Sequence, residues 1–239
     1  MSMHAGDKLV AVSNYDDQPD VSTLPRVGDY QQVDWEKLIA LKPTAMIVQM
    51  RPDHMPPGLV DKAQSFGIQL VNVQIEQVAD IYAAAVQLAD VAGDPAAGKA
   101  LVDSIRKQLE VIRHNAEGKP RPRVLMVVDV EGKAAVGRGT FLSDLLETAG
   151  GDNVMPDGGP HWPSIDREML ASLKPDVILQ LLPGASDQLL AQAKSAWTTL
   201  PDVPAVKSGR VYSLTDWYLH QPGPHIADTA KLFADRLHP

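Results

Sequence analysis

Apolar side chains recur at helical spacing through the middle of the chain. Between residues 78 and 92 they repeat every three or four positions, and Gly93 ends this first predicted helix. Asp94 and Pro95 are typical of the N-cap and first position of a second helix, which the pattern extends to about Asn115. At 1.5 Å per residue this second helix would be roughly 30 Å long. The pattern therefore predicts one long helix between two stretches of a different kind.

Those two stretches share a second pattern, in which a short capped helix stops at Lys-Pro and an apolar strand follows. The segment VDWEKLIALKPTAMIVQ begins at Val33, and IDREMLASLKPDVILQ begins at Ile165. In each copy an Asp is predicted to cap the helix, and Lys-Pro to end it. The constant offset is 132, and the identical pairs are Asp34 and Asp166, Glu36 and Glu168, Leu38 and Leu170, Leu41 and Leu173, Lys42 and Lys174, and Pro43 and Pro175. The repeat predicts two similar α/β halves.

A second echo suggests that the halves differ in length. HAGDKLV at His4 resembles TAGGDNV at Thr148, and each is typical of a helix that ends at Gly and turns into an extended segment. In the later half this echo follows a predicted strand from Arg123 and an amphipathic helix from Thr140, for which the earlier half has no room. We therefore expect the first lobe to lack an opening strand and helix. Homodimerisation, a strand from a partner or lower stability would follow.

The domain organisation follows from these patterns. We expect an N-terminal lobe over residues 1–77, a helical linker with the long helix over 78–118, and a C-terminal lobe over 119–239. The predicted fold class is α/β, with two similar lobes joined by a single long helix and a ligand cleft between the lobes.

Composition and charge exclude several classes of protein. The chain has 239 residues, 44% of them apolar, so each half can bury a core. Its formal net charge of -8 argues against binding to nucleic acid, because no basic stripe is present to neutralise phosphates. Cysteine is absent, which excludes disulfides and thiolate sites. No apolar run approaches the roughly 20 residues that cross a bilayer, and MSMHAGDKL lacks the pattern of a signal peptide.

Catalytic motifs are weak. GDPAAGKA from Gly93 has phosphate-loop spacing, but a predicted helix precedes it and Ala100 occupies the magnesium position. GRGTF from Gly137 fits a small anion site or a tight turn equally well. We therefore expect no enzyme activity, no catalytic residues, no metal site and no cofactor. A minor alternative is direct zinc capture by converging histidines, namely His54, His161 and His220.

Candidate ligand contacts come from a rule for open α/β sheets, in which ligands lie beyond the carboxyl ends of the strands. Aromatic residues gather at such places, and flat aromatic faces suit a large planar ligand. The candidates after strands are Tyr15, Arg51, Asp216, Trp217 and Tyr218, and those before the two capped helices are Tyr30 and Trp162. Trp162 could instead be a hydrophobic staple for its helix, and Arg51 could be solvated or meet an anionic group of the ligand. Trp35 is expected to pack.

These segments in this order resemble the class III periplasmic binding proteins, the helical-backbone receptors of ABC importers for cobalamin, ferric siderophores and haem. The resemblance runs over nearly the whole chain from about Ala5, through VGDY, GRGTFLSDLLETAGGDNV, PAVKSGRVY and QPGPHIAD. AVSNYDDQP and HWPSIDRE are most similar to the receptors for vitamin B12. This sequence departs from those receptors at Gln18 and Tyr30, where they look aromatic and carry Trp respectively, and at His225, where PGPR is familiar. The aromatic box is therefore thinner here.

The resemblance implies an extracytoplasmic receptor that binds cobalamin or a related corrinoid and delivers it to a permease dimer. A ferric siderophore or haem is the alternative ligand. Family receptors dock through one acidic residue on each lobe, and Glu36 and Glu168 match those positions, although both also suit a helix N-terminus. The alternative from another class is a truncated interaction or oligomerisation module without a transport function.

Overall fold

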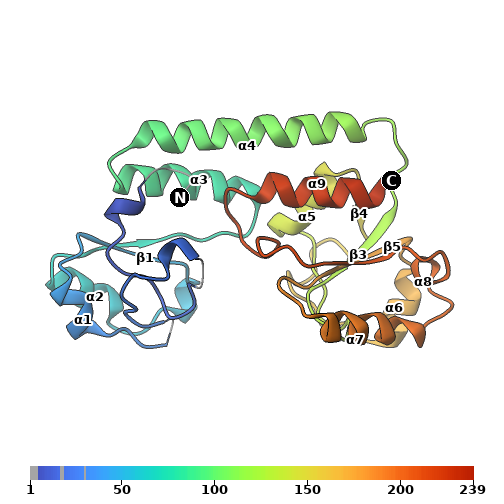
Figure 1. Cartoon of the computed structure of the whole chain (residues 1–239), viewed down its shortest axis with the longest axis horizontal. Coiled ribbons are helices and arrows are strands. Elements are labelled where there is room, and N and C mark those ends of the chain that lie inside the picture. The colour runs from blue at the N-terminus through green and yellow to red at the C-terminus, as the bar shows by residue number, and fades with distance from the viewer. Residues whose placement is uncertain (1–4, 17–18, 30) are drawn as a thin grey trace. The chain divides into compact units, whose positions relative to one another are not determined.

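A computed structural model describes residues 5–16, 19–29 and 31–239, so Tyr30 and Gln18 lie outside the described residues. The chain divides into two compact units. Unit 1 comprises Met1–Ile75 and Tyr82–Val102, and unit 2 comprises Glu76–Ile81 and Asp103–Pro239. Both contain parallel strands with helices packed against them (Figure 1), so the predicted α/β fold class is confirmed. The predicted lobe boundaries stay a prediction.

Unit 2 contains a four-stranded parallel sheet in the order β4-β3-β5-β6. Its strands are β3 (Arg123–Val127), β4 (Asp152–Asn153), β5 (Val177–Leu181) and β6 (Val211–Leu214). Five helices lie wholly within unit 2, namely α5 (Phe141–Thr148), α6 (Arg167–Leu173), α7 (Asp187–Thr198), α8 (Pro204–Lys207) and α9 (Ile226–Leu237). Helices α5 and α9 contact each other on one side of the sheet, and α6, α7 and α8 lie on the other (Figure 1).

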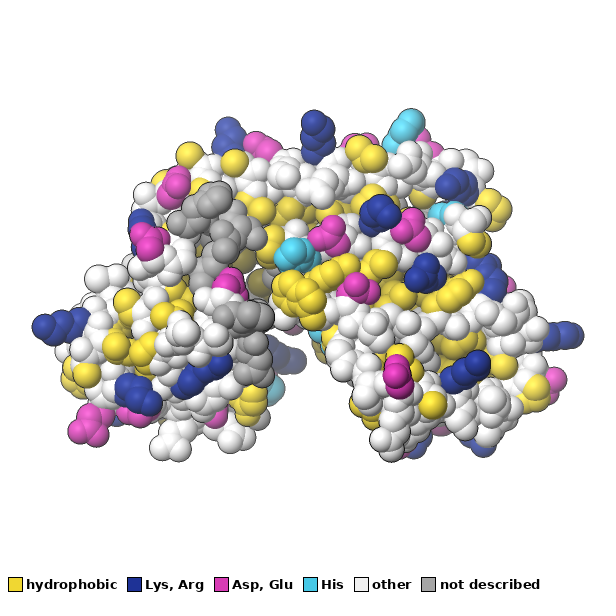
Figure 2. Space-filling model, in the orientation of Figure 1, with side chains coloured by type: hydrophobic (Ala, Val, Ile, Leu, Met, Phe, Trp, Pro, Cys, Tyr) yellow, Lys and Arg dark blue, Asp and Glu magenta, His cyan; other side chains and the backbone are white. Residues whose placement is uncertain are grey.

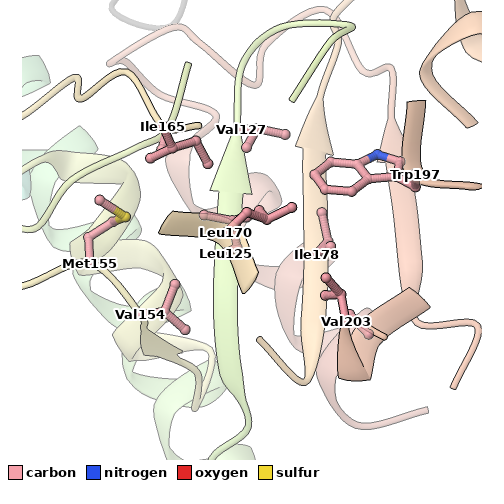
Figure 3. Close-up of a cluster of buried hydrophobic side chains, with 11 residues drawn as sticks. Leu125, Val127, Val154, Met155, Ile165, Leu170, Ile178, Trp197 and Val203 are labelled. Atoms are coloured by element: carbon pink, nitrogen blue, oxygen red, sulfur yellow. The ribbon is translucent and has the colours of Figure 1, made fainter. Parts of the chain in front are cut away.

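The core of unit 2 explains why β5 is apolar throughout. Both of its faces are covered, as expected for the centre of a parallel sheet, and all five of its residues are buried. Figure 3 shows the cluster beneath α6, α7 and α8, where the Trp197 ring lies beside Val127 and Ile178. The buried members of this cluster are Leu125, Val127, Ala135, Val154, Met155, Ile165, Leu170, Ile178, Trp197, Val203 and Ala205.

Unit 1 is smaller. Its described strands β1 (Ala45–Val48) and β2 (Gln69–Asn72) pair in parallel, and an isolated parallel bridge joins Val12 to Arg26. Helices α1 (Trp35–Ala40) and α2 (Leu59–Ser65) pack with one face of the strands through Leu38, Ala63 and Met46. Short 3-10 helices occupy η1 (Gly6–Lys8), η2 (Pro19–Val21) and η3 (Pro52–His54).

Two helices contribute residues to both units. Helix α3 (Val78–Val91) covers β2 through a cluster that includes Val71 and Ala84, and α4 (Pro95–Ala116) is the predicted long helix, 22 residues in length. Gly98 of α4 packs so closely on α3 that a β-carbon there would lie 2.5 Å from Cβ of Ala89. The close approach of the two backbones therefore requires glycine at this position.

The sequence repeat is a structural repeat. Asp34 accepts from the Lys37 amide at 3.0 Å, and Asp166 accepts from the Met169 amide at 2.8 Å, so each Asp caps its helix as predicted. The matched Lys42 and Lys174 adopt φ values of 50° and 45°, and among the described residues they are the non-glycine residues with positive φ. In each half, the chain therefore leaves the helix and turns toward the next strand at a lysine in the left-handed conformation.

One predicted echo is wrong in its first copy. Gly150 has a φ of 82° and follows α5 as expected, but Gly6 opens the 3-10 helix η1 instead of ending a helix. The strand after the first Lys-Pro, β1, has four residues, and its counterpart β5 has five.

Candidate functional site

An aromatic group follows β6 at the carboxyl end of the unit 2 sheet, where ligand contacts were predicted. Trp217 has 54% of its surface exposed. Its ring meets the edge of Tyr218 with centroids 5.7 Å apart and an interplanar angle of 83°, and lies 5.1 Å from the ring of His225. Figure 2 shows apolar side chains gathered over the loop between β6 and α9. We call Trp217, Tyr218 and His225 the β6 wall.

The third ring of the β6 wall is held from two sides. His225 stacks on Tyr218, with centroids 5.3 Å apart and an interplanar angle of 25°, and its Nδ1 lies 2.9 Å from Oδ2 of Asp228. Burial raises the pKa of the Tyr218 hydroxyl, and the negative charges of Asp216 and Asp228 raise it further. The hydroxyl is therefore a stable hydrogen-bond donor near neutral pH, in a wall whose charged neighbours are carboxylates.

Trp162 lies in a loop whose backbone is fixed. The amide of Gly137 donates to the His161 carbonyl at 2.8 Å, and that of Ala135 donates to the Pro163 carbonyl at 2.9 Å, so the two segments run side by side. The indole itself is 53% exposed. Because the backbone is held on both sides of it, the ring projects from an ordered segment.

The staple interpretation of Trp162 is wrong. A staple joins the residue before the N-cap to the fourth helical residue, which here are Ile165 and Leu170. Both are buried in the same apolar cluster. In unit 1 the equivalent Val33 and Leu38 also share a cluster. Trp162 therefore takes no part in the staple, and its ligand contact stays a prediction.

His161 connects this loop to the segment that opens α3. Its Nδ1 lies 2.9 Å from Oε2 of Glu76, and the Glu76 carbonyl accepts from the Phe141 amide at 2.5 Å. Next to this contact, Asp144 of α5 accepts from the Val78 amide at 2.9 Å. Burial raises the pKa of the Asp144 carboxyl, although the Val78 hydrogen bond opposes the shift. These contacts attach the start of α3 to unit 2.

The same contacts decide between the two interpretations of GRGTF. Thr140 caps α5 by accepting from the Ser143 amide at 3.2 Å, and its own hydroxyl donates to the Gly137 carbonyl at 2.9 Å. The Phe141 amide is engaged by Glu76. Since side-chain and backbone groups of the protein use these donors, the segment is a structural turn and helix cap.

In unit 1 the structure describes two of the three predicted ligand contacts. Tyr15 is 65% exposed. Arg51 forms a two-pronged pair with Asp53, with Nε and Nη2 each 3.2 Å from a carboxylate oxygen, and this contact lowers the pKa of Asp53. Tyr30 lies outside the described residues. Trp35 packs against Phe66, with ring centroids 6.0 Å apart, as expected.

The predicted docking residues Glu36 and Glu168 occupy equivalent exposed positions, each two residues after its capping Asp. Within the described part of the chain no group of three or more His, Asp or Glu side chains could hold a metal ion, and no helix there has the length and apolarity of a membrane span.

Sequence reasoning missed two partner carboxylates. Asp228 lies three residues after His225 at the start of α9, a spacing that brings side chains together and could have been noticed. Glu76 lies 85 residues before His161, and no local signal joins that pair.

Comparison with known proteins then places the chain in a family. The family model described as periplasmic binding protein matches residues 3–218. The chain belongs to this family. Its members are solute-binding proteins, which are not enzymes, and they deliver ligands to ABC permeases.

Relatives to which this periplasmic binding protein is similar include proteins that bind vitamin B12 and a protein that binds heme. A vitamin B12-binding protein of Vibrio parahaemolyticus is 25% identical over 221 residues, which are 92% of this chain and 78% of that protein. The crystal structure of the periplasmic vitamin B12 binding protein of Vibrio cholerae has a TM-score of 0.79 and 25% identity, over 99% of this chain and 90% of its own. A periplasmic heme-binding protein, BhuT, in complex with two hemes has a TM-score of 0.77 and 25% identity, over 96% and 88%.

Proposed function

We propose that this protein is the substrate-binding receptor of an ABC importer and that its substrate is cobalamin or a related corrinoid. The observation that carries the proposal is the β6 wall, in which the exposed Trp217 ring packs with the half-buried rings of Tyr218 and His225 at the carboxyl end of a parallel sheet. Exposed Trp162 adds a second flat ring from the same unit. Tyr15, Tyr30 and Arg51 stay predicted contacts from unit 1.

The charge of the wall favours a corrinoid over haem. The negative charges of Asp216 and Asp228 raise the pKa of Tyr218, and the Glu76 carboxylate contacts His161. Carboxylates therefore lie near both of these rings. Haem carries two propionates, which would be repelled by such a surface unless a cation intervened. The periphery of cobalamin consists mainly of neutral amides, which hydrogen-bond to carboxylates and to the Tyr218 hydroxyl. Haem or a ferric siderophore is the second candidate, supported by the likeness to a heme-binding structure.

Ligand binding by the purified protein tests this proposal. We expect cobalamin to bind with a stoichiometry of one in calorimetry, and Trp162→Ala and Trp217→Ala each to weaken it by about 1–3 kcal/mol, as for a buried aromatic anchor. Trp35→Phe is the matched control, because Trp35 packs within unit 1, and its affinity should not change.

Three outcomes separate the alternatives. Binding of haemin or a ferric siderophore without cobalamin would move the assignment to the second candidate. Equal affinity in the wild type and both tryptophan variants would remove the aromatic contacts from the site. If none of the three ligands binds, the chain is better explained as a non-transport interaction module. The predicted homodimer would belong to that explanation and stays a prediction.

We also propose that Glu36 and Glu168 form the docking contacts with the permease dimer. Their equivalent positions in the repeat support this, because a two-fold partner is matched by two similar contacts. The resemblance described above supports it as well. Delivery of this kind takes place outside the cytoplasm, and that is the location we propose for the protein.

A further inference from the structure

The orientation of His225 gives it a chemical property that the other rings of the β6 wall lack. Its Nδ1 lies 2.9 Å from a carboxylate oxygen of Asp228, and a carboxylate only accepts hydrogen bonds. The proton of a neutral imidazole is therefore on Nδ1, which leaves the lone pair on Nε2. A histidine oriented by a carboxylate through one nitrogen is the usual arrangement of a metal ligand that binds through the other.

The ring is also held in place. Tyr218 stacks on it and Trp217 meets it at 71°, while the His225 carbonyl accepts from the Thr229 amide at 3.1 Å in the first turn of α9. The side chain is nevertheless 41% exposed. Within the described residues Nε2 makes no hydrogen bond, so the protein there leaves its lone pair unused, in a side chain that is partly open to solvent.

A free metal ion does not suit this position. Zinc takes three or four protein ligands, and the described residues contain no group of three or more His, Asp or Glu that could supply them. A metal macrocycle needs fewer ligands from the protein, because its ring already provides four equatorial nitrogens and leaves axial positions open. One histidine on an aromatic wall matches that need.

We infer that His225 binds the metal of the transported chelate through Nε2, so that the substrate class is a metal tetrapyrrole with an exchangeable axial position. This rests on the proposed function. In the binding step a metal–water bond breaks, a metal–Nε2 bond forms and no electron is transferred. Asp228 is a positioning residue that sets the tautomer.

Two forms of one ligand test the inference. Aquocobalamin has an exchangeable axial water, whereas cyanide blocks that position in cyanocobalamin. We expect aquocobalamin to show the absorbance change of an imidazole adduct when bound, and cyanocobalamin to bind without it. His225→Ala should remove the change and weaken aquocobalamin at least tenfold, while affecting cyanocobalamin much less. Asp228→Asn should weaken aquocobalamin by roughly 10- to 100-fold, as for the loss of a carboxylate behind a metal-bound histidine.

His114→Ala provides the matched control. His114 pairs with Glu117 at the same i, i+3 spacing, at 3.2 Å, but lies on exposed α4. Its loss should leave the spectrum unchanged. Circular dichroism should show that His225→Ala is folded. The same titrations with haemin would report ligation through the Soret band.

The outcomes distinguish the inference from the proposed function. If aquocobalamin and cyanocobalamin bind equally and no spectrum depends on His225, the receptor function stands and the inference is overturned. If neither cobalamin nor haemin binds, the inference and the proposed corrinoid substrate both fail. A spectral change that folded His225→Ala loses and His114→Ala keeps, with either macrocycle, supports the inference.

Discussion

Replacing Lys174 by glycine should stabilise the protein, although it removes a side chain. Lys174 follows α6 with a φ of 45°, in the left-handed region that L-residues avoid because Cβ approaches the carbonyl oxygen. Glycine has no Cβ and adopts this conformation freely. The same reasoning applies to Lys42, whose φ is 50°.

The size of the effect follows from two opposed terms. The left-handed conformation costs a non-glycine residue roughly 1–2 kcal/mol. Glycine loses about 0.5–1 kcal/mol more backbone entropy on folding than alanine does. The difference predicts that each substitution raises the free energy of unfolding by about 0.5–1 kcal/mol. For a chain of this size, that corresponds to a rise in Tm of roughly 1–4 °C.

Lys207→Gly is the control. Lys207 is an exposed lysine at the last position of α8, so its replacement removes the same charge from a right-handed residue and should lower the free energy of unfolding by about 1 kcal/mol. Calorimetry gives Tm, and hydrogen exchange of peptides from each unit locates the effect in unit 1 for Lys42→Gly and in unit 2 for Lys174→Gly. If Lys42→Gly and Lys174→Gly both lower Tm, as Lys207→Gly should, then the left-handed conformation of these lysines does not destabilise the protein.

Two other predictions concern docking and pH. Glu36→Lys with Glu168→Lys should leave ligand affinity within about twofold and abolish stimulation of the cognate transporter's ATPase in proteoliposomes, through like-charge contacts; normal stimulation would leave both glutamates as helix-terminal charges only. Burial, with the charges of Lys119 and Arg210, lowers the pKa of His238, so the folded protein binds this proton less well than the unfolded chain does. The contribution of neutral His238 to the free energy of unfolding should therefore be fully present above the ordinary histidine pKa. It should be lost as the pH drops through the lowered pKa of the folded protein. His238→Gln should flatten part of this fall in urea titrations between about pH 7.5 and pH 5, and equal slopes would contradict the assignment.

Local signals account for the parts of the fold that the sequence predicted. Asp34 and Asp166 cap their helices because a short acceptor next to free amides acts within three residues. The long helix and the buried β5 likewise follow from periodicity and apolar content over one segment. The family resemblance added the membership that the family match confirms, whereas the class of ligand stays a proposal for this chain.

The remaining features depend on contacts between distant residues. Asp144 accepts from the Val78 amide, 66 residues away, and no pattern near either residue predicts it. Gly6 shows the converse, since its heptapeptide is similar to a true helix end but Gly6 itself opens a 3-10 helix. The aromatic positions were predictable as strand-end residues, but the stacking of His225 on Tyr218 depends on how the loop after β6 returns to α9.

The passage of α3 and α4 through both units has a consequence for the folding of the nascent chain. Unit 1 needs Tyr82–Val102 to be complete, while unit 2 already includes Glu76–Ile81. Neither unit is therefore an uninterrupted stretch of sequence, and the first cannot finish as it emerges from the ribosome until the opening residues of the second have been made. For the same reason no single proteolytic cut releases unit 2 intact, because even a cut between Val102 and Asp103 of α4 separates Glu76–Ile81 from the rest of that unit, so limited proteolysis there should destabilise unit 2.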